Sequence, residues 1–208
     1  MSAYSVEVNS TDLLAVQTLL RHAPKAFDTA LVRATNRGLT KGRTTMVNET
    51  ADRLNLKKKR IRQDITIGKA SKFRMRAWIK SKGKPVNLEA FGSRQTKKGV
   101  SVQVLKANPR YLVRHAWIGL GANANKILLR REKTEENAPY YGTKRPNPNL
   151  VYSALPEEFR YPLESLTGPR VQDITDNPEV IGAVQKEASE TISEELKRQT
   201  DLFLRKYA

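Results

Sequence analysis

The stretch NPEVIGAVQKEASETISEELKRQTDLF, residues 177–203, decides how the C-terminal part of the chain folds. Apolar side chains recur in it every four positions, which places them on one face of an α-helix. The recurring residues are Val180, Val184, Ala188, Ile192 and Leu196. Pro178 suits the first turn of that helix, where its missing N–H loses no hydrogen bond. The stretch therefore predicts a long amphipathic helix over residues 178–206.

The N-terminal part of the chain, residues 1–63, also has a helical pattern. Two apolar-periodic runs occupy residues 11–20 and 26–34. Pro24 separates them and can lie in the first turn of the second helix. These runs predict two helices before the middle of the chain.

Two glycines and an asparagine mark where we expect the N-terminal helices to be interrupted. Gly38 and Gly42 each cost about 1 kcal/mol relative to alanine inside a helix, so a bend or break is expected there. Asn55 is expected to cap a short basic helix over Leu56–Arg62.

Between residues 64 and 131 the hydrophobic period changes to two. One face of the first alternating run carries Phe73, Met75, Ala77 and Ile79, and the other carries Arg74, Arg76, Trp78 and Lys80. Further alternating runs begin at Val86, Val100, Tyr111 and Ile127. Several short strands joined by turns predict an antiparallel sheet.

The rest of the chain links this sheet to the C-terminal helix. Residues 132–177 are expected to form a long loop region, because they are polar at first, rich in proline and irregular in pattern. We therefore predict one α+β domain over residues 1–208. It has N-terminal helices, a central antiparallel sheet, and the long C-terminal amphipathic helix packed on that sheet.

Composition excludes several classes of protein. The 208 residues include no Cys, which rules out disulfides, thiolate zinc sites and Cys nucleophiles. The first ten residues, MSAYSVEVNS, do not have the pattern of a signal peptide. No apolar run approaches the roughly 20 residues of a membrane helix, so we expect a protein that is made in a cytoplasm and stays soluble.

Positive charge is concentrated in the middle of the chain. The net charge is +17, and residues 51–110 hold 18 Lys or Arg against three acids, a net charge of +15. Residues 151–208 have seven basic and eleven acidic residues, a net charge of −4. Such a field attracts polyanions in a salt-dependent way. It also suits contact between copies, with the acidic end of one chain against the basic middle of the next.

Two basic clusters are candidates for a DNA- or partner-binding surface. One is the run Lys57, Lys58, Lys59, Arg60 and Arg62, and the other is the strand face with Arg74, Arg76 and Lys80 around Trp78. Lys72, Lys82 and Lys84 lie beside the second cluster. With them, residues 57–62 and 72–84 hold eleven basic residues and no acid. The alternative is a solvated face, with Trp78 packed under a helix while the long basic side chains reach water.

Signals of an enzyme are poor. The two histidines, His22 and His115, have no acidic cluster near them in sequence and suit structural positions, His115 inside a strand. The run GLGANA, residues 119–124, mimics a dinucleotide fingerprint, but a strand follows it where a helix is needed, so a hairpin turn is the better interpretation. A nuclease needs converging carboxylates, which the basic middle lacks. We predict no catalytic residues, no metal site and no cofactor.

The order of motifs resembles the phage minor tail protein Z family of siphophages and prophages. The segments that carry the resemblance are GKPVNLEAF (83–91), KKGVSVQVLK (97–106), HAWIGL (115–120), ILLRRE (127–132) and RYPLESLTGPRVQDI (160–174). The most specific piece has Pro162 followed by Gly168 and Pro169, which we interpret as a turn leading into the final helix. Arg170 stands where the family has a Ser.

The resemblance implies a non-enzymatic structural protein of the virion. It implies tail completion at the head-proximal end of the tail, in tail assembly and head–tail joining. Expected partners are other tail and neck proteins, further copies of the chain in an oligomer such as a ring, and packaged DNA, with no membrane and no small-molecule substrate. The expected location is the tail or neck of a virion assembled in the host cytoplasm. The alternative function is a sequence-nonspecific DNA-binding protein.

Overall fold

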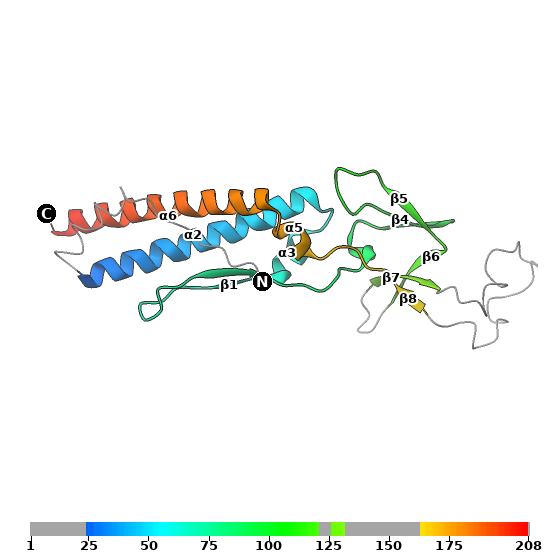
Figure 1. Ribbon diagram of the computed structural model, residues 1–208, viewed down its shortest axis with the longest axis horizontal. Coiled ribbons are helices and arrows are strands. Elements are labelled where there is room, and N and C mark those ends of the chain that lie inside the picture. The colour runs from blue at the N-terminus through cyan, green and yellow to red at the C-terminus, as the bar shows by residue number, and fades with distance from the viewer. Residues whose placement is uncertain (1–23, 121–125, 132–162, 208) are drawn as a thin grey trace, which may run out of the picture. The chain divides into compact units, whose positions relative to one another are not determined.

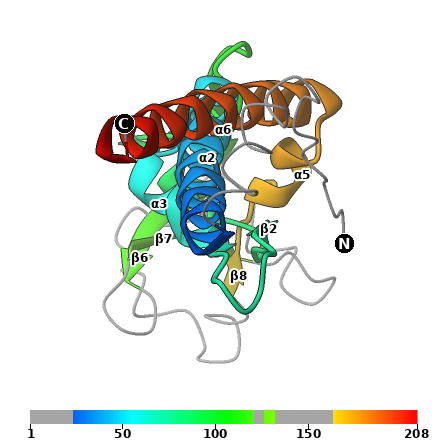
Figure 2. The ribbon, with the colours of Figure 1, turned by 90° about the vertical axis from the view of Figure 1, so that its left-hand side faces the viewer.

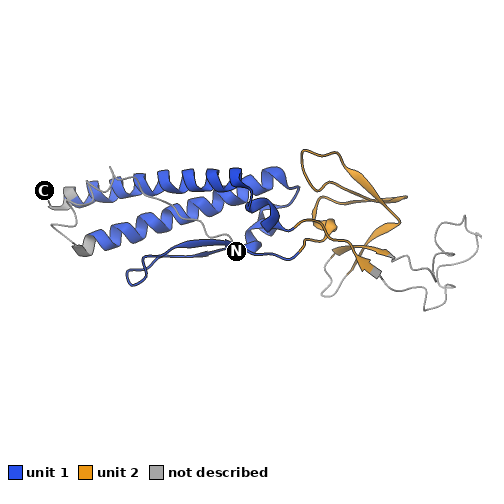
Figure 3. Ribbon diagram, viewed as in Figure 1, with its two compact units in different colours: residues 1–84, 170–208 blue, residues 85–169 orange. Residues whose placement is uncertain are grey.

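The computed structural model describes residues 24–120, 126–131 and 163–207 (Figure 1). The helix expected at residues 11–20, most of the loop region, and Pro162 lie outside the described residues. The chain divides into two compact units, coloured separately in Figure 3. Unit 1 combines residues 1–84 with residues 170–208, and unit 2 is residues 85–169. Long helices together with small antiparallel sheets confirm the α+β fold class.

Two 30-residue helices that lie side by side form the body of unit 1 (Figures 1 and 2). They are α2, Pro24–Arg53, and α6, Pro178–Tyr207. The five residues of the four-residue repeat in α6 are all buried, so the predicted C-terminal helix and its apolar stripe are confirmed. The helix packs on α2, however, and the expectation that it packs on a sheet was wrong. The physical reason is length, because only another long helix can cover a stripe of that extent.

The break expected as one possibility at the glycines of α2 was also wrong, since α2 is continuous through Gly38 and Gly42. A β-carbon on Gly38 would collide with Ile192 Cγ1 and lie 2.9 Å from the Ala188 carbonyl oxygen of α6. Gly38 therefore allows close approach of the two helices. That packing outweighs the poor helix propensity of glycine.

The rest of unit 1 is built from short elements around α2. They are α3 (Lys58–Asp64), β1 (Ile65–Gly68), β2 (Trp78–Ser81) and α5 (Val171–Thr175). The basic helix begins at Lys58 and Lys57 is its N-cap, so the predicted start at Leu56 was wrong because Leu56 is buried outside the helix. The strand expected through Phe73 begins only at Trp78. Helix α5 falls in a segment expected to be irregular, and the Arg170 N–H donates to Asp173 Oδ2 at its start.

Unit 2 contains two three-stranded antiparallel sheets. The first has the order β3 (Arg94–Thr96), β4 (Gly99–Val102) and β5 (Tyr111–Arg114). The second has the order β6 (Ala116–Leu120), β7 (Lys126–Arg131) and β8 (Leu163–Ser165). Strand β8 lies in the predicted loop region, and Val86 precedes a 3-10 helix, η1 (Leu88–Ala90), instead of starting a strand. The single central sheet is thus replaced by small sheets in both units.

Candidate functional site: a basic segment and a motif contact

The predicted basic residues fall on α3 and on the hairpin that follows it directly in unit 1. We call residues 57–84 the basic segment; it holds twelve Lys or Arg and one acid, Asp64. Of the predicted site residues, Lys57, Lys58, Lys59, Arg60 and Arg62 lie at the N-cap and within α3. Arg74 and Arg76 lie between the hairpin strands, and Lys80 lies on β2.

Few of these cations are neutralised within the chain. Arg60 forms an ion pair of 2.7 Å with Asp64, and Lys58 Nζ donates to Asn48 Oδ1 at 2.8 Å. In the described residues, the side chains of the other six predicted cations make no hydrogen bond or ion pair; these are Lys57, Lys59, Arg62, Arg74, Arg76 and Lys80. Most of them are exposed, so their charge faces solvent.

Three acids of α6 do not compensate this segment, because they pair with α2. Glu195 contacts Arg37 at 2.8 Å, Glu187 contacts Lys41 at 3.1 Å, and Glu179 contacts Arg53 at 2.8 Å. These pairs join the two long helices of unit 1. Three of the acids expected to meet another copy are thus used within one chain.

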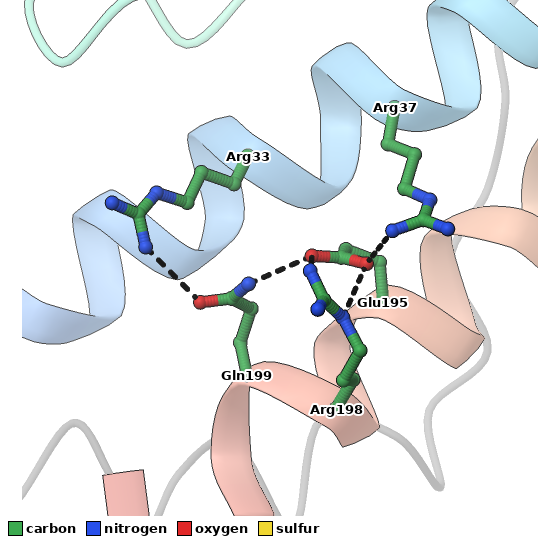
Figure 4. Close-up of polar contacts among 5 residues, drawn as sticks. All are labelled: Arg33, Arg37, Glu195, Arg198 and Gln199. Carbon is green, nitrogen blue, oxygen red and sulfur yellow. Dashed lines mark hydrogen bonds and ion pairs between the residues drawn. The ribbon is translucent and has the colours of Figure 1, made fainter. Parts of the chain in front are cut away.

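Glu195 is the most tightly held of these acids (Figure 4). It is 4% exposed, and the Arg198 guanidinium donates to it at 2.6 and 2.9 Å. Gln199 donates a further hydrogen bond of 2.7 Å. The hydrogen bonds from Arg198 lower the pKa of Glu195 to about 2, against the opposing effect of burial, with help from Gln199 and Arg37. The carboxylate therefore stays ionised and fastens α6 to α2.

The β1–β2 hairpin, residues 65–81, is fixed along α2 by its inner face. Asn36 of α2 donates to the Ala70 carbonyl at 3.0 Å and accepts from the Ala70 N–H at 2.9 Å. Ile65 is fully buried. On the outer face the Trp78 indole lies across Gly68, its partner in the strand register, where a β-carbon would collide with the ring. Trp78 is 48% exposed, so the expectation that it packs under a helix was wrong.

In unit 2, two of the sequence motifs meet in the core. The Gly168 N–H donates to the Val86 carbonyl at 2.7 Å, and a β-carbon on Gly168 would lie 2.9 Å from Phe91 Cε2. Phe91 is fully buried. Gly168 is therefore needed for close packing. Pro169 leads into α5 and only then into α6, which corrects the expected direct turn into the final helix.

Comparison with known protein families gives a match over most of the chain. A sequence model of the family described as "Prophage minor tail protein Z (GPZ)" matches residues 14–208. The chain belongs to the prophage minor tail protein Z family. No curated protein and no solved structure matches it.

As a member of the minor tail protein Z family, the chain is a structural protein of a phage tail and not an enzyme. It acts in contact with other tail proteins, as the family description implies. In the part of the chain that the structure describes, no group of three or more His, Asp or Glu could hold a metal ion. No helix described here could cross a bilayer.

Two further expectations about motifs can be compared with the structure. His115 lies between β5 and β6 with a positive φ of 59°, a turn conformation that His tolerates, so its placement inside a strand was wrong. Strand β7 follows the GLGANA run and pairs antiparallel with β6, which confirms that no nucleotide-binding helix follows that run.

Sequence reasoning missed Asn87 of this tail protein. Its Oδ1 accepts from the Glu89 N–H at 2.9 Å and from the Leu128 N–H at 2.8 Å, and its Nδ2 donates to Ser165 Oγ at 2.9 Å. Asn87 thus connects η1 with β7 and β8. The sequence pattern that could have pointed to Asn87 is an amide side chain between two apolar residues, Val86 and Leu88.

Proposed function

We propose that this minor tail protein acts in tail completion, at the head-proximal end of the tail where the tail joins the head. Family membership supports a structural role in the tail, and the motif order suggested the finer one. The observation that carries the proposal is the uncompensated basic segment, because concentrated like charge destabilises a fold by self-repulsion. A binding partner of opposite charge gives such a segment a function.

The proposed partners are other tail and neck proteins, further copies of the chain and packaged DNA. A head-to-tail contact between copies would generate a ring if its rotation closes. The proposed location is the tail or neck of the virion, after assembly in the host cytoplasm. Within this function, the eight predicted cations form the partner surface, and Gly168 with Pro169 maintains unit 2.

The test is charge reversal at Lys57, Lys58 and Lys59. These side chains are exposed, so their replacement by Glu should leave the melting temperature nearly unchanged while the yield of infectious particles falls. The matched control reverses three exposed lysines of unit 2, Lys97, Lys98 and Lys106. Normal assembly and infection by the folded Lys57–Lys59 variant would show that the segment is only a solvated surface.

A second candidate function is sequence-nonspecific DNA binding as the main role of the protein. The unpaired cations on α3 and the hairpin favour it. A gel shift with duplex DNA at rising salt separates the two functions. An assembly protein should bind weakly or not at all at physiological salt, whereas a dedicated DNA-binding protein should still bind there.

A further inference from the structure

The end of the β1–β2 hairpin carries apolar side chains that no core explains. Ser71 and Arg74 exchange backbone hydrogen bonds of 2.9 and 3.1 Å, which makes Lys72 and Phe73 the central residues of a tight turn. Phe73 is fully exposed, and Met75 is 45% exposed. Tight turns favour Gly, Asn, Asp and Pro for their backbone preferences, so turn geometry does not call for a phenylalanine here. The side chain at this position is better explained by contact with another molecule.

The base of the hairpin is held on α2 by hydrogen bonds close to the turn. The paired hydrogen bonds between Asn36 and Ala70 hold the chain on α2 just before the turn. Trp78 covers Gly68 on the outer face at the last paired position. A fixed base reduces the conformational entropy that binding would otherwise lose.

The charge around the tip indicates what kind of molecule it contacts. Residues 69–76 contain Lys69, Lys72, Arg74 and Arg76 and no acid. In the described residues, none of these four side chains forms an ion pair. Duplex DNA presents about one negative charge per 1.7 Å of its axis, a continuous match for a row of cations.

A second copy of the chain offers a poorer match. The outward face of α6 carries the exposed acids Glu190 and Glu194, but Lys186 and Lys197 alternate with them and reduce their field. An apolar side chain flanked by cations is also the device with which some proteins enter the minor groove, where the apolar wedge partly unstacks a base step. Phe73 between Lys72 and Arg74 has this composition.

We propose that the β1–β2 hairpin is a DNA-contacting arm. Its cations bind backbone phosphates, and Phe73 inserts as a wedge between base pairs from the minor groove. The inference rests on the proposed role of the basic segment and names duplex DNA as its partner. Phosphate contacts carry no base identity, so the cations of the arm bind without sequence preference. The inserted Phe73 bends the duplex by about 20–90°.

The experiment measures binding and bending of one DNA probe by the purified full chain. The probe is a duplex of about 30 base pairs with a fluorophore at each end, read by anisotropy for affinity and by energy transfer for bending, at 50 and 200 mM NaCl. Wild type should bind at 50 mM and lose most of its affinity at 200 mM. Phe73→Ala should keep most of the affinity and lose the bend, while Phe73→Trp should keep both.

Charge reversal of the arm provides the second measurement. Replacing Lys72, Arg74 and Arg76 by Glu should weaken binding at 50 mM at least about tenfold more than reversing Lys97, Lys98 and Lys106. Losing three phosphate contacts should reduce the slope of log affinity against log salt by about 2.7. Both variants change the net charge equally, so the comparison isolates the arm from the overall field.

Three results would overturn the inference. Equal weakening by the two reversals would show that only net charge matters, and unchanged bending by Phe73→Ala would eliminate the wedge. If the wild-type protein does not bind the DNA probe at 50 mM NaCl, and reversal of the arm charges dissociates an oligomer in sedimentation, the partner of the arm is a second copy of the chain. The infectivity test at Lys57–Lys59 is independent of these results, so a role in assembly can stand when contact with DNA fails.

Discussion

Replacing Gly38 by alanine is the sharpest test of how closely α2 and α6 pack. At an unobstructed helix position, alanine stabilises by about 1 kcal/mol relative to glycine. Gly182 of α6 is such a position, since nothing lies within 4 Å of a β-carbon there. Gly182→Ala should therefore raise the free energy of unfolding by about 1 kcal/mol.

At Gly38 the same gain is opposed by a collision. The new β-carbon would overlap Ile192 Cγ1 and lie 2.9 Å from both Ile192 Cδ1 and the Ala188 carbonyl oxygen. The carbonyl belongs to the α6 backbone, so relief requires the helices to move apart. Overpacking of this kind costs about 1–3 kcal/mol. With a cost near the upper end, Gly38→Ala should lower the free energy of unfolding by a net value of about 1–2 kcal/mol.

Gly42 supplies the matched control on the same helix. Its β-carbon would lie 3.3 Å from Ile79 Cδ1 and 3.4 Å from Val184 Cγ1, ends of side chains that can yield. Gly42→Ala should be neutral or slightly stabilising. Urea unfolding at 25 °C, followed by circular dichroism, ranks the variants. The melting temperature of Gly38→Ala should fall by about 3–6 °C.

A double-mutant cycle connects the effect to its cause. Ile192→Ala removes both carbons that meet the new methyl group, so it should be less damaging in the Gly38→Ala protein than in wild type, by about 1 kcal/mol. If Gly38→Ala is as stable as Gly42→Ala, or if the cycle shows no coupling, the close approach of α2 and α6 at this point is refuted.

Four other predictions concern different parts of the chain. The pKa of Glu195 is about 2, below its ordinary value of 4.5, so the ionised side chain stabilises the folded protein above pH 5 and this stabilisation is lost as the pH falls toward 2. Glu195→Gln should therefore make the melting temperature less dependent on pH between pH 7 and pH 2. It should also lower the free energy of unfolding at pH 7 by about 2 kcal/mol. Ile192→Asp should destabilise by several kcal/mol because it buries a charge, and an unchanged thermal melt would contradict the buried stripe. Asn87→Ala should lower the free energy of unfolding by about 1–3 kcal/mol by leaving the buried Leu128 N–H unpaired, whereas Asn87→Asp, which keeps the acceptor, should lose less. We also propose that the two compact units melt together as the single domain predicted from sequence; two separate calorimetric transitions would count against it.

Features with a local period were predictable from the sequence. The four-residue repeat in α6 fixed the position and the buried face of that helix, because helix geometry converts spacing directly into a face. The alternation around Ile79 correctly placed Trp78 and Ile79 on opposite faces, but it could not show where pairing stops. Phe73 and Met75 continue the alternation beyond the last paired residues and so were wrongly assigned to a strand.

Features that depend on contacts distant in sequence were not predictable. Gly38 and Gly42 have poor propensity, and only the presence of α6 shows why a continuous helix contains them. Asn87 meets residues 41 and 78 positions away, which no local pattern records. The basic residues of the candidate surface were found by counting charge. Only the structure shows that three acids of α6 pair with α2 and that most cations of the candidate surface have no acidic partner.

The pairing of α2 with α6 also delays the folding of unit 1 while the chain is being synthesised. Arg37 and Glu195, which meet across the two helices, are 158 residues apart in the chain. At about 5–20 residues per second, a ribosome needs roughly 8–30 s between them, and all of unit 2 emerges in the meantime. During that interval the face of α2 that packs on α6 has no partner. A nascent chain is therefore unable to complete unit 1 or display its hairpin on a finished support until translation reaches α6, which ties competence for assembly to late synthesis.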